Sequence, residues 1–181
     1  MNALPRLAFL ALVGPSLPDP AGPPVTRVAV EVFRVGLTAA RDGRLVFSKG
    51  EDRLENGENP DRLARVLAAD DPGAIALVHS TSWRWEPDGR IMLTYIAWMK
   101  DGPAGPEARP LPPLPPPGPT DPLHPRPAEI RELDPLAHGL RHLAFVLRTS
   151  RDGGVARALG PDAIAALRRF EPEVAGELPE P

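Results

Sequence analysis

Prolines concentrate in one stretch of the chain, and this stretch limits how the chain can fold. Between residues 103 and 127, twelve of twenty-five positions are proline. Proline has no N–H for a helix or sheet and has a fixed φ, so we expect no packed element there, only polyproline II or a disordered linker. The sequence therefore predicts one domain over residues 25–172, interrupted by this proline-rich linker, with flexible segments at 1–24 and 173–181.

The overall composition restricts the class of protein. A length of 181 residues suits a single domain, and 42% of the residues are hydrophobic. The formal net charge is -3, whereas nucleic-acid-binding domains usually carry a basic excess, so we expect no nucleic-acid partner. There is no cysteine, which excludes disulfides, thiolate catalysis and cysteine-based zinc sites and fits a cytoplasmic protein.

The beginning of the sequence leaves one alternative for location. An apolar run from Leu7 to Val13 follows a single positive charge at Arg6. The run is too short to span a membrane, so we expect no membrane span. It reaches only the lower limit of a secretory signal, and no clear cleavage site follows it. We therefore expect a cytoplasmic protein; the alternative is secretion, with residues 1–22 acting as a signal peptide.

Two strand pairs are predicted from alternation and turn residues. Residues 25–38 alternate with a period of two, and Asp42-Gly43 precedes a shorter apolar run over 44–49. Residues 74–85 and 90–100 are two longer runs rich in β-branched and aromatic residues, separated by the turn sequence EPDG. Each pair predicts a hairpin.

Helices are predicted on both sides of the proline-rich stretch. Asn59 followed by Pro60 is typical of a helix start, and Asp70 to Gly73 ends that helix. Residues 134–149 carry a leucine stripe, and shorter helices are expected over 155–159 and from 161 onward. Two hairpins followed by helices favour an α+β fold. We expect a two-layer sandwich in which about three helices cover an antiparallel four-stranded sheet.

The segment VHSTSWRW, residues 78–85, holds the first candidate site. In a regular strand His79, Thr81, Trp83 and Trp85 share one face. A hairpin closed by EPDG places His79 opposite Ile96, Ser80 opposite Tyr95 and Ser82 opposite Leu93. We expect Trp83 to be largely buried under a helix. The ligand-binding candidates, which could hold an anion or carboxylate, are Ser80, Ser82, Arg84 and Tyr95. The simpler interpretation, which we prefer, is the solvated face of a one-sided sheet.

Histidines form the second candidate site. His138 and His142 are four residues apart on one predicted helix and so share a face. His79 is one possible third ligand, and Glu132 or Asp134 is another. However, no spaced metal-binding motif is present. We therefore expect structural histidines and no bound metal, with His79, His138 and His142 kept as weak metal candidates.

One short motif resembles a known recognition sequence. RPLPPLP, residues 109–115, is similar to the proline-rich ligands of SH3 domains, in which prolines dock into aromatic grooves and the arginine pairs with a carboxylate. The resemblance covers seven residues and implies a protein partner. The alternative is a passive spacer.

Two functions remain open from the sequence. The first is a small binding module without catalytic activity or cofactor, which contacts a small molecule or a protein through the hairpin over 79–98. The alternative is a metal-assisted hydrolase that uses His79, His138 and His142. Phosphate-loop, dinucleotide and nucleophile-elbow motifs are absent from the sequence. An enzyme requires its side chains to converge in a cleft, so convergence discriminates between the two.

Overall fold

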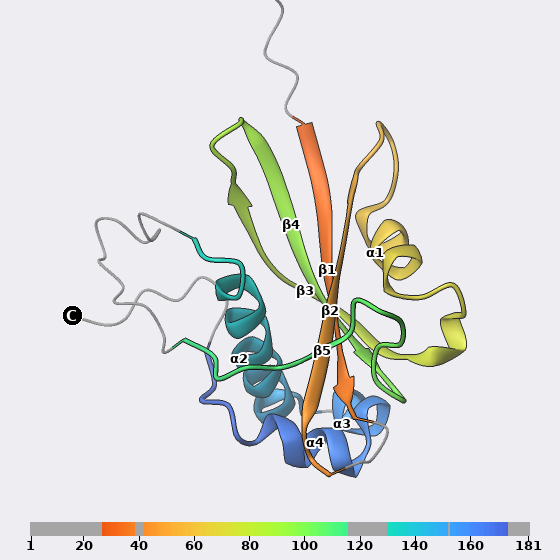
Figure 1. Cartoon of the computed structure of the whole chain (residues 1–181), viewed down its shortest axis with the longest axis vertical. Coiled ribbons are helices and arrows are strands. Elements are labelled where there is room, and N and C mark those ends of the chain that lie inside the picture. Colours follow the sequence, from red (N-terminus) through yellow and green to blue (C-terminus); the bar gives the residue numbers. More distant parts are fainter. Residues whose placement is uncertain (1–26, 39–41, 116–129, 152, 174–181) are drawn as a thin grey trace, which may run out of the picture.

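The computed structural model describes residues 27–38, 42–115, 130–151 and 153–173 (Figure 1). The predicted N-terminal segment 1–24, residues 116–127 of the predicted linker and most of the predicted tail lie outside these ranges. Within them, helices and strands form an α+β domain, as the sequence predicted.

A mixed five-stranded sheet forms the centre of the domain. Its strands are β1 (Arg27–Leu37), β2 (Leu45–Arg53), β3 (Ile75–Trp85), β4 (Arg90–Met99) and β5 (Arg109–Pro110), in the spatial order β3-β4-β1-β2-β5. Both predicted hairpins are present, because β1 pairs antiparallel with β2 and β3 pairs antiparallel with β4. The prediction of an antiparallel four-stranded sheet was wrong, since β5 is a fifth strand and β1 runs parallel to β4.

The parallel pair has a physical basis in β1, which is apolar on both faces. Val30 and Val32 are fully buried on one side of the sheet, and Phe33 and Val35 are buried on the other. A strand with two apolar faces is most stable in the middle of a sheet that is covered on both sides. The chain between β2 and β3 crosses over with a helix, so β4 can return beside β1.

In the part of the chain that the structure describes, four α-helices and one short 3-10 helix accompany the sheet. They are α1 (Pro60–Ala68), η1 (Pro72–Ala74), α2 (Asp134–Thr149), α3 (Gly154–Leu159) and α4 (Pro161–Leu167). The predicted cap is confirmed, because the Asn59 side chain accepts hydrogen bonds from the backbone N–H groups of Asp61 and Arg62. Across the described ranges, no helix has the length and apolar character needed to cross a membrane.

The helices cover both faces of the sheet, so the domain has three layers and the predicted two-layer sandwich was wrong. Helix α1 packs through Leu63 and Ala64 on the side that we call the α1 face. Helices α2, α3 and α4 pack on the opposite side, the α2 face, where Leu136, Leu140 and Leu143 are fully buried (Figure 1). An apolar stripe along a helix shows that this side of the helix packs against another element, but it does not show which face of the sheet the helix packs on.

The first half of the predicted proline-rich linker is packed, which corrects the expectation for residues 103–115. Arg109–Pro110 forms β5 at the sheet edge, where proline is tolerated because its missing N–H faces away from the ladder. The Leu111 N–H donates to the Leu45 carbonyl at 2.8 Å, and Leu111 and Leu114 pack against the core of the α2 face. Leucines between the prolines therefore anchor this segment to the domain.

Candidate functional site

A β-bulge at Thr81 determines which way the candidate residues of β3 point. His79 lies opposite Ile96 and Ser80 opposite Tyr95, as predicted from the turn. The register then shifts, and Ser82 lies opposite Thr94 where the sequence predicted Leu93. The extra residue places two consecutive side chains against the same face, so the alternation of β3 is reversed beyond this point. The Thr81 side chain is buried and donates to the Thr94 carbonyl at 3.2 Å.

The four predicted ligand-binding residues consequently lie on two faces of the sheet. Ser80 and Tyr95 face α1, and the Tyr95 hydroxyl donates to Asp61 of that helix at 2.7 Å. Burial, together with this bond to Asp61, raises the pKa of Tyr95 to about 12. Ser82 and Arg84 are on the α2 face. The structure therefore brings these residues together as two pairs and not as one pocket.

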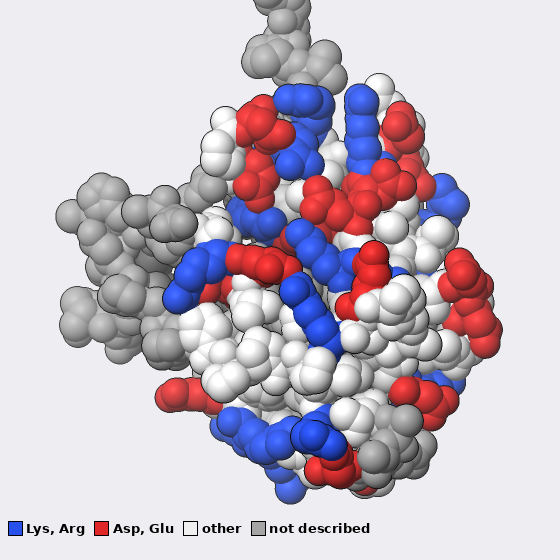
Figure 2. Space-filling view, in the orientation of Figure 1, with Lys and Arg blue, Asp and Glu red and all other residues white. Residues whose placement is uncertain are grey.

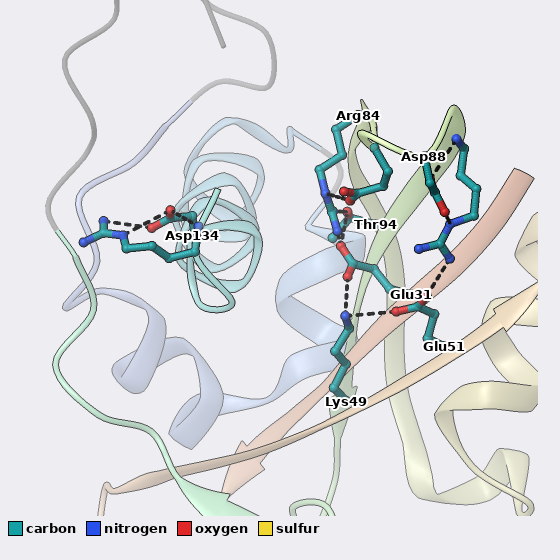
Figure 3. A network of polar contacts seen from close by, with 10 residues as sticks. Glu31, Lys49, Glu51, Arg84, Asp88, Thr94 and Asp134 are labelled. Carbon is teal, nitrogen blue, oxygen red and sulfur yellow. Dashed lines mark hydrogen bonds and ion pairs between the residues drawn. The ribbon is translucent and has the colours of Figure 1, made fainter. Parts of the chain in front are cut away.

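Arg84 is engaged by a buried carboxylate. Its guanidinium binds Glu31, whose side chain is 1% exposed, and its Nε donates to Glu86 at 2.6 Å (Figure 3). The Thr94 hydroxyl donates to Glu31 at 2.7 Å, and the Lys49 Nζ lies 2.9 Å from the second carboxylate oxygen. A guanidinium so occupied is not an open receptor for a ligand anion.

The environment of Glu31 keeps its carboxylate charged. Burial raises the pKa of Glu31, but hydrogen bonds from Arg84, Thr94 and Lys49 outweigh burial, and the pKa lies below its ordinary value. Sequence reasoning missed this residue, although a signal was present. A single acidic residue interrupts the apolar run VAVEVF, and a lone charge in a strand buried on both faces requires partners.

A row of charged residues extends from this network toward the turn between β3 and β4. Glu51 contacts the Lys49 Nζ and the Arg90 Nη1, each at 3.1 Å, and Arg90 also pairs with Asp88 at 2.7 Å. Figure 2 shows acidic and basic side chains intermixed over this part of the molecule. This part of the molecule therefore offers no extended patch of one charge sign that would attract a charged ligand.

The three candidate histidines do come together, through a close approach of α2 to the sheet. Gly139 permits this approach, since a Cβ at that position would lie 2.7 Å from the Ile96 side chain. The rings of His79 and His142 are stacked with centroids 5.3 Å apart, and those of His138 and His142 are stacked at 6.2 Å. Within the ranges that the structure describes, no group of three or more His, Cys, Asp or Glu side chains is arranged to hold a metal ion.

Glu173, which follows α4, orients two of these rings. His138 Nδ1 lies 3.0 Å from a Glu173 carboxylate oxygen, and His142 Nδ1 lies 3.3 Å from the Glu173 backbone carbonyl. Burial lowers the pKa of His142, and the neighbouring His138 adds to this effect against the opposing Glu173 carbonyl. Burial and the proximity of His142 lower the pKa of His79. The arrangement therefore favours neutral imidazoles at His79 and His142, where α2 contacts β3.

The tryptophans of β3 contradict the prediction that Trp83 is buried. Trp83 is 63% exposed and Trp85 is 45% exposed, whereas Trp98 on β4 is 2% exposed. The bulge at Thr81 turns Trp83 and Trp85 to the α1 face. The tip of the β3–β4 hairpin extends beyond α1, which lies beside the middle of the sheet (Figure 1). The two aromatic side chains are therefore left in solvent.

The segment that resembles SH3 ligands is used inside the domain. The Arg109 guanidinium pairs with Glu132 and lies over the Phe47 ring, 4.7 Å from its centroid. The carbonyl of Pro115, the last residue of the motif, accepts a hydrogen bond from Arg141. An SH3 domain would have to displace these contacts to read the motif.

Comparison with known proteins provides no functional assignment. The sequence matches no protein-family model and no curated protein. The functional argument therefore depends on the geometry of the described residues, among which the exposed tryptophans are the feature that internal packing does not explain.

Proposed function

We propose that this domain is a protein-binding module without catalytic activity, and that it binds through the outer end of β3. We call residues 82–86 the tryptophan edge. The observation that carries the proposal is the exposure of Trp83 and Trp85, which sit two residues apart on one face of the outermost strand.

Exposure of a tryptophan side chain to water is unfavourable in free energy, whereas its burial at a protein interface is favourable. Each Trp side chain can bury about 150–250 Å² of surface, and Trp is enriched among the residues that contribute most to binding. In the described ranges, Val66 on α1 is the one other large hydrophobic residue with comparable exposure. Two such side chains side by side are typical of a contact surface.

The position of the tryptophans on an edge strand adds a second binding element. β3 pairs with β4 on one side and with no described strand on the other. The outward backbone groups of such a strand can hydrogen-bond an extended polypeptide, while neighbouring side chains select its sequence. Backbone pairing and aromatic contacts together favour a polypeptide ligand over a small molecule.

Two hollows on the surface fit a small molecule poorly. One is lined by Arg27, Val28, Ala29, Glu51, Asp52, Arg53 and Arg90, and the other by Lys49, Pro106, Glu107, Arg109 and Glu132. Small-molecule sites are usually concave and mostly apolar. Both hollows are lined mainly by charged side chains, several already paired with each other, and neither includes Trp83 or Trp85.

The polar chemistry of the domain favours binding over the alternative hydrolase. Arg84, Tyr95 and His138 each have an internal acidic partner. The histidines meet as an enzyme would require, but they stack, and Glu173 holds the Nδ1 atoms of His138 and His142. This arrangement supports a structural contact between α2 and β3.

Site-specific photo-cross-linking tests the proposed function. A photoreactive amino acid is placed at Trp85 in cells that express the protein, and a matched variant carries it at Val66, which is 60% exposed on α1. We expect a discrete polypeptide adduct from position 85 and none from position 66. Equal labelling at the two positions, or no polypeptide adduct at 85, would contradict a binding function for the tryptophan edge.

A further inference from the structure

We propose that the polypeptide bound by the tryptophan edge is a second copy of this chain, paired antiparallel through β3. This inference rests on the proposed function and deepens it by naming the partner. The same surface patch from each copy then forms a closed two-fold interface.

The two edges of the sheet differ in how they are protected. At one edge, β5 has two residues and contains Pro110, which prevents further pairing. At the other edge, β3 has eleven residues and contains neither proline nor lysine. Natural edge strands carry such residues, bulges or inward-pointing charges to prevent association. β3 has the bulge at Thr81 and the inward-facing Arg84, so any pairing is confined to the regular stretch beyond the bulge.

The bulge limits the pairing to the outer end of β3. At Thr81 the ladder is irregular, while residues 82–85 return to a regular register with β4. Five residues, 82–86, are therefore available. If Arg84 lies on the two-fold axis, Trp83 of one copy is directly opposite Trp85 of the other, and both are on the α1 face. This register forms two cross-strand aromatic pairs, which are among the favourable pairs in antiparallel sheets.

Charges on the opposite face fit the same register. Arg84 and Glu86 are paired within one copy through the 2.6 Å contact of Arg84 Nε. With Arg84 on the axis, Glu86 of each copy is the diagonal neighbour of Arg84 of the other. The two arginines then lie directly opposite each other, which is unfavourable by itself, but each already pairs with Glu31 and Glu86 of its own copy and gains the Glu86 of the other copy as a third acidic neighbour.

The size of this contact predicts a weak dimer. The exposed parts of four tryptophans and a five-residue strand pair are smaller than a standard interface of about 1,600 Å². We therefore expect a dissociation constant on the order of micromolar, with exchange between monomer and dimer at concentrations usual for purified protein.

Analytical ultracentrifugation of the full chain from about 1 to 500 μM tests the partner. We expect the average mass to rise from that of one chain, 19.5 kDa, toward twice that value. The double substitution Trp83→Lys/Trp85→Lys should weaken association at least about 100-fold, since tryptophans are among the residues that contribute most to binding at interfaces. The control Val66→Lys should associate like the parent. A parent that remains monomeric at all concentrations, or a double variant that still dimerises, would overturn the inference.

Disulfide trapping tests the register, because the chain has no cysteine of its own. The register places Ser82 of one copy opposite Glu86 of the other, within the Cα separation that a disulfide allows. A mixture of Ser82→Cys and Glu86→Cys chains should therefore oxidise to a covalent dimer faster than either chain alone, or than Val66→Cys mixed with Glu86→Cys. Equal rates in all mixtures would reject this pairing.

The two proposals fail in different ways. A monomeric parent that still gives an adduct between position 85 and another polypeptide would reject the second copy and retain the binding surface. A monomeric parent with no adduct would reject both.

Discussion

The side chains of His79 and Arg84 lie on the same face of the sheet, although a separation of five positions would place them on opposite faces of a regular strand. The bulge at Thr81 produces this relationship. It lets His79 contact His142 on α2 while Arg84, on the same side, reaches the buried carboxylate of Glu31.

The same bulge exposes the tryptophans. Without it, Arg84 would face α1 and Trp83 and Trp85 would face α2. One extra residue in β3 therefore satisfies a buried charge on one face and creates an aromatic surface on the other. Bulges that redirect a functional side chain are common at sheet edges, and β3 is an edge strand.

Truncation of Trp83 should have little effect on the stability of the monomer. We expect Trp83→Ala to lower the free energy of unfolding by less than about 1 kcal/mol, because a 63% exposed side chain loses few contacts. The matched change Trp98→Ala, at a 2% exposed position, should cost about 3–5 kcal/mol. Urea melts at low micromolar concentration measure both. A loss above about 3 kcal/mol for Trp83→Ala would show that the ring is buried.

The secondary structure was predictable because its signals are local. Asn59-Pro60 starts α1, the EPDG turn joins β3 to β4, and leucines at helical spacing define α2. Each signal depends on residues that are neighbours along the chain. The predicted pairings of His79 and Ser80 were also correct. Between the turn and the bulge, residues 82–85 pair one position away from the predicted register, and the extra residue at Thr81 shifts the register back by one.

The arrangement of these elements depended on signals that are not local. Nothing in the residues of β4 states that it pairs parallel with β1, although the apolar residues on both faces of β1 indicate a central strand. The sequence VHSTSWRW carries no signal that predicts the bulge, because Ser, Thr and Trp are compatible with either face of a sheet. The packing of Leu111 and Leu114 was hidden by the surrounding prolines.

Removal of the Glu31 charge should destabilise the domain. We expect Glu31→Gln to cost about 3 kcal/mol, because it leaves Arg84 and Lys49 beside a buried neutral group. Glu51→Gln, where the side chain is 36% exposed, should cost less than about 1 kcal/mol. Denaturant melts at pH 7 provide the comparison. Equal losses of unfolding free energy from the two substitutions would mean that burial does not determine how much Glu31 contributes to stability.

The leucines of the proline-rich segment should contribute to stability. Leu111→Ala and Leu114→Ala each remove a partly buried side chain from the core of the α2 face, and we expect a loss of about 1–2 kcal/mol for each. Pro113→Ser, at an exposed position between them, should change stability by less than about 0.5 kcal/mol. Thermal melts of the three variants would contradict the packing if all three resembled the parent.

Zinc should leave the melting temperature unchanged. A metal bound only to the native state stabilises it in proportion to the logarithm of its concentration. The rings of His79, His138 and His142 stack, and Glu173 contacts two of them. Among the described residues, no group of three or more His, Cys, Asp or Glu side chains is arranged to hold a metal ion. We expect calorimetric scans with EDTA and with excess zinc to coincide. A rise of several degrees with zinc that disappears in His142→Ala would instead support the metal-assisted hydrolase.

The histidine stack should make the domain less stable in mild acid. Because the pKa values of His79 and His142 are lowered in the folded state, the unfolded chain binds more protons as the pH falls below about 6.5. The free energy of unfolding should therefore be highest above this pH and decrease toward the folded pKa values. His142→Phe retains a stacking ring beside His79 and removes one titrating group, so its stability should change less between pH 7.5 and 5.5 than that of the parent. Val66→Ala, away from the stack, should show the parental pH dependence. Urea midpoints at three pH values measure the difference, and parallel curves for parent and His142→Phe would show that this ring does not titrate differently on folding.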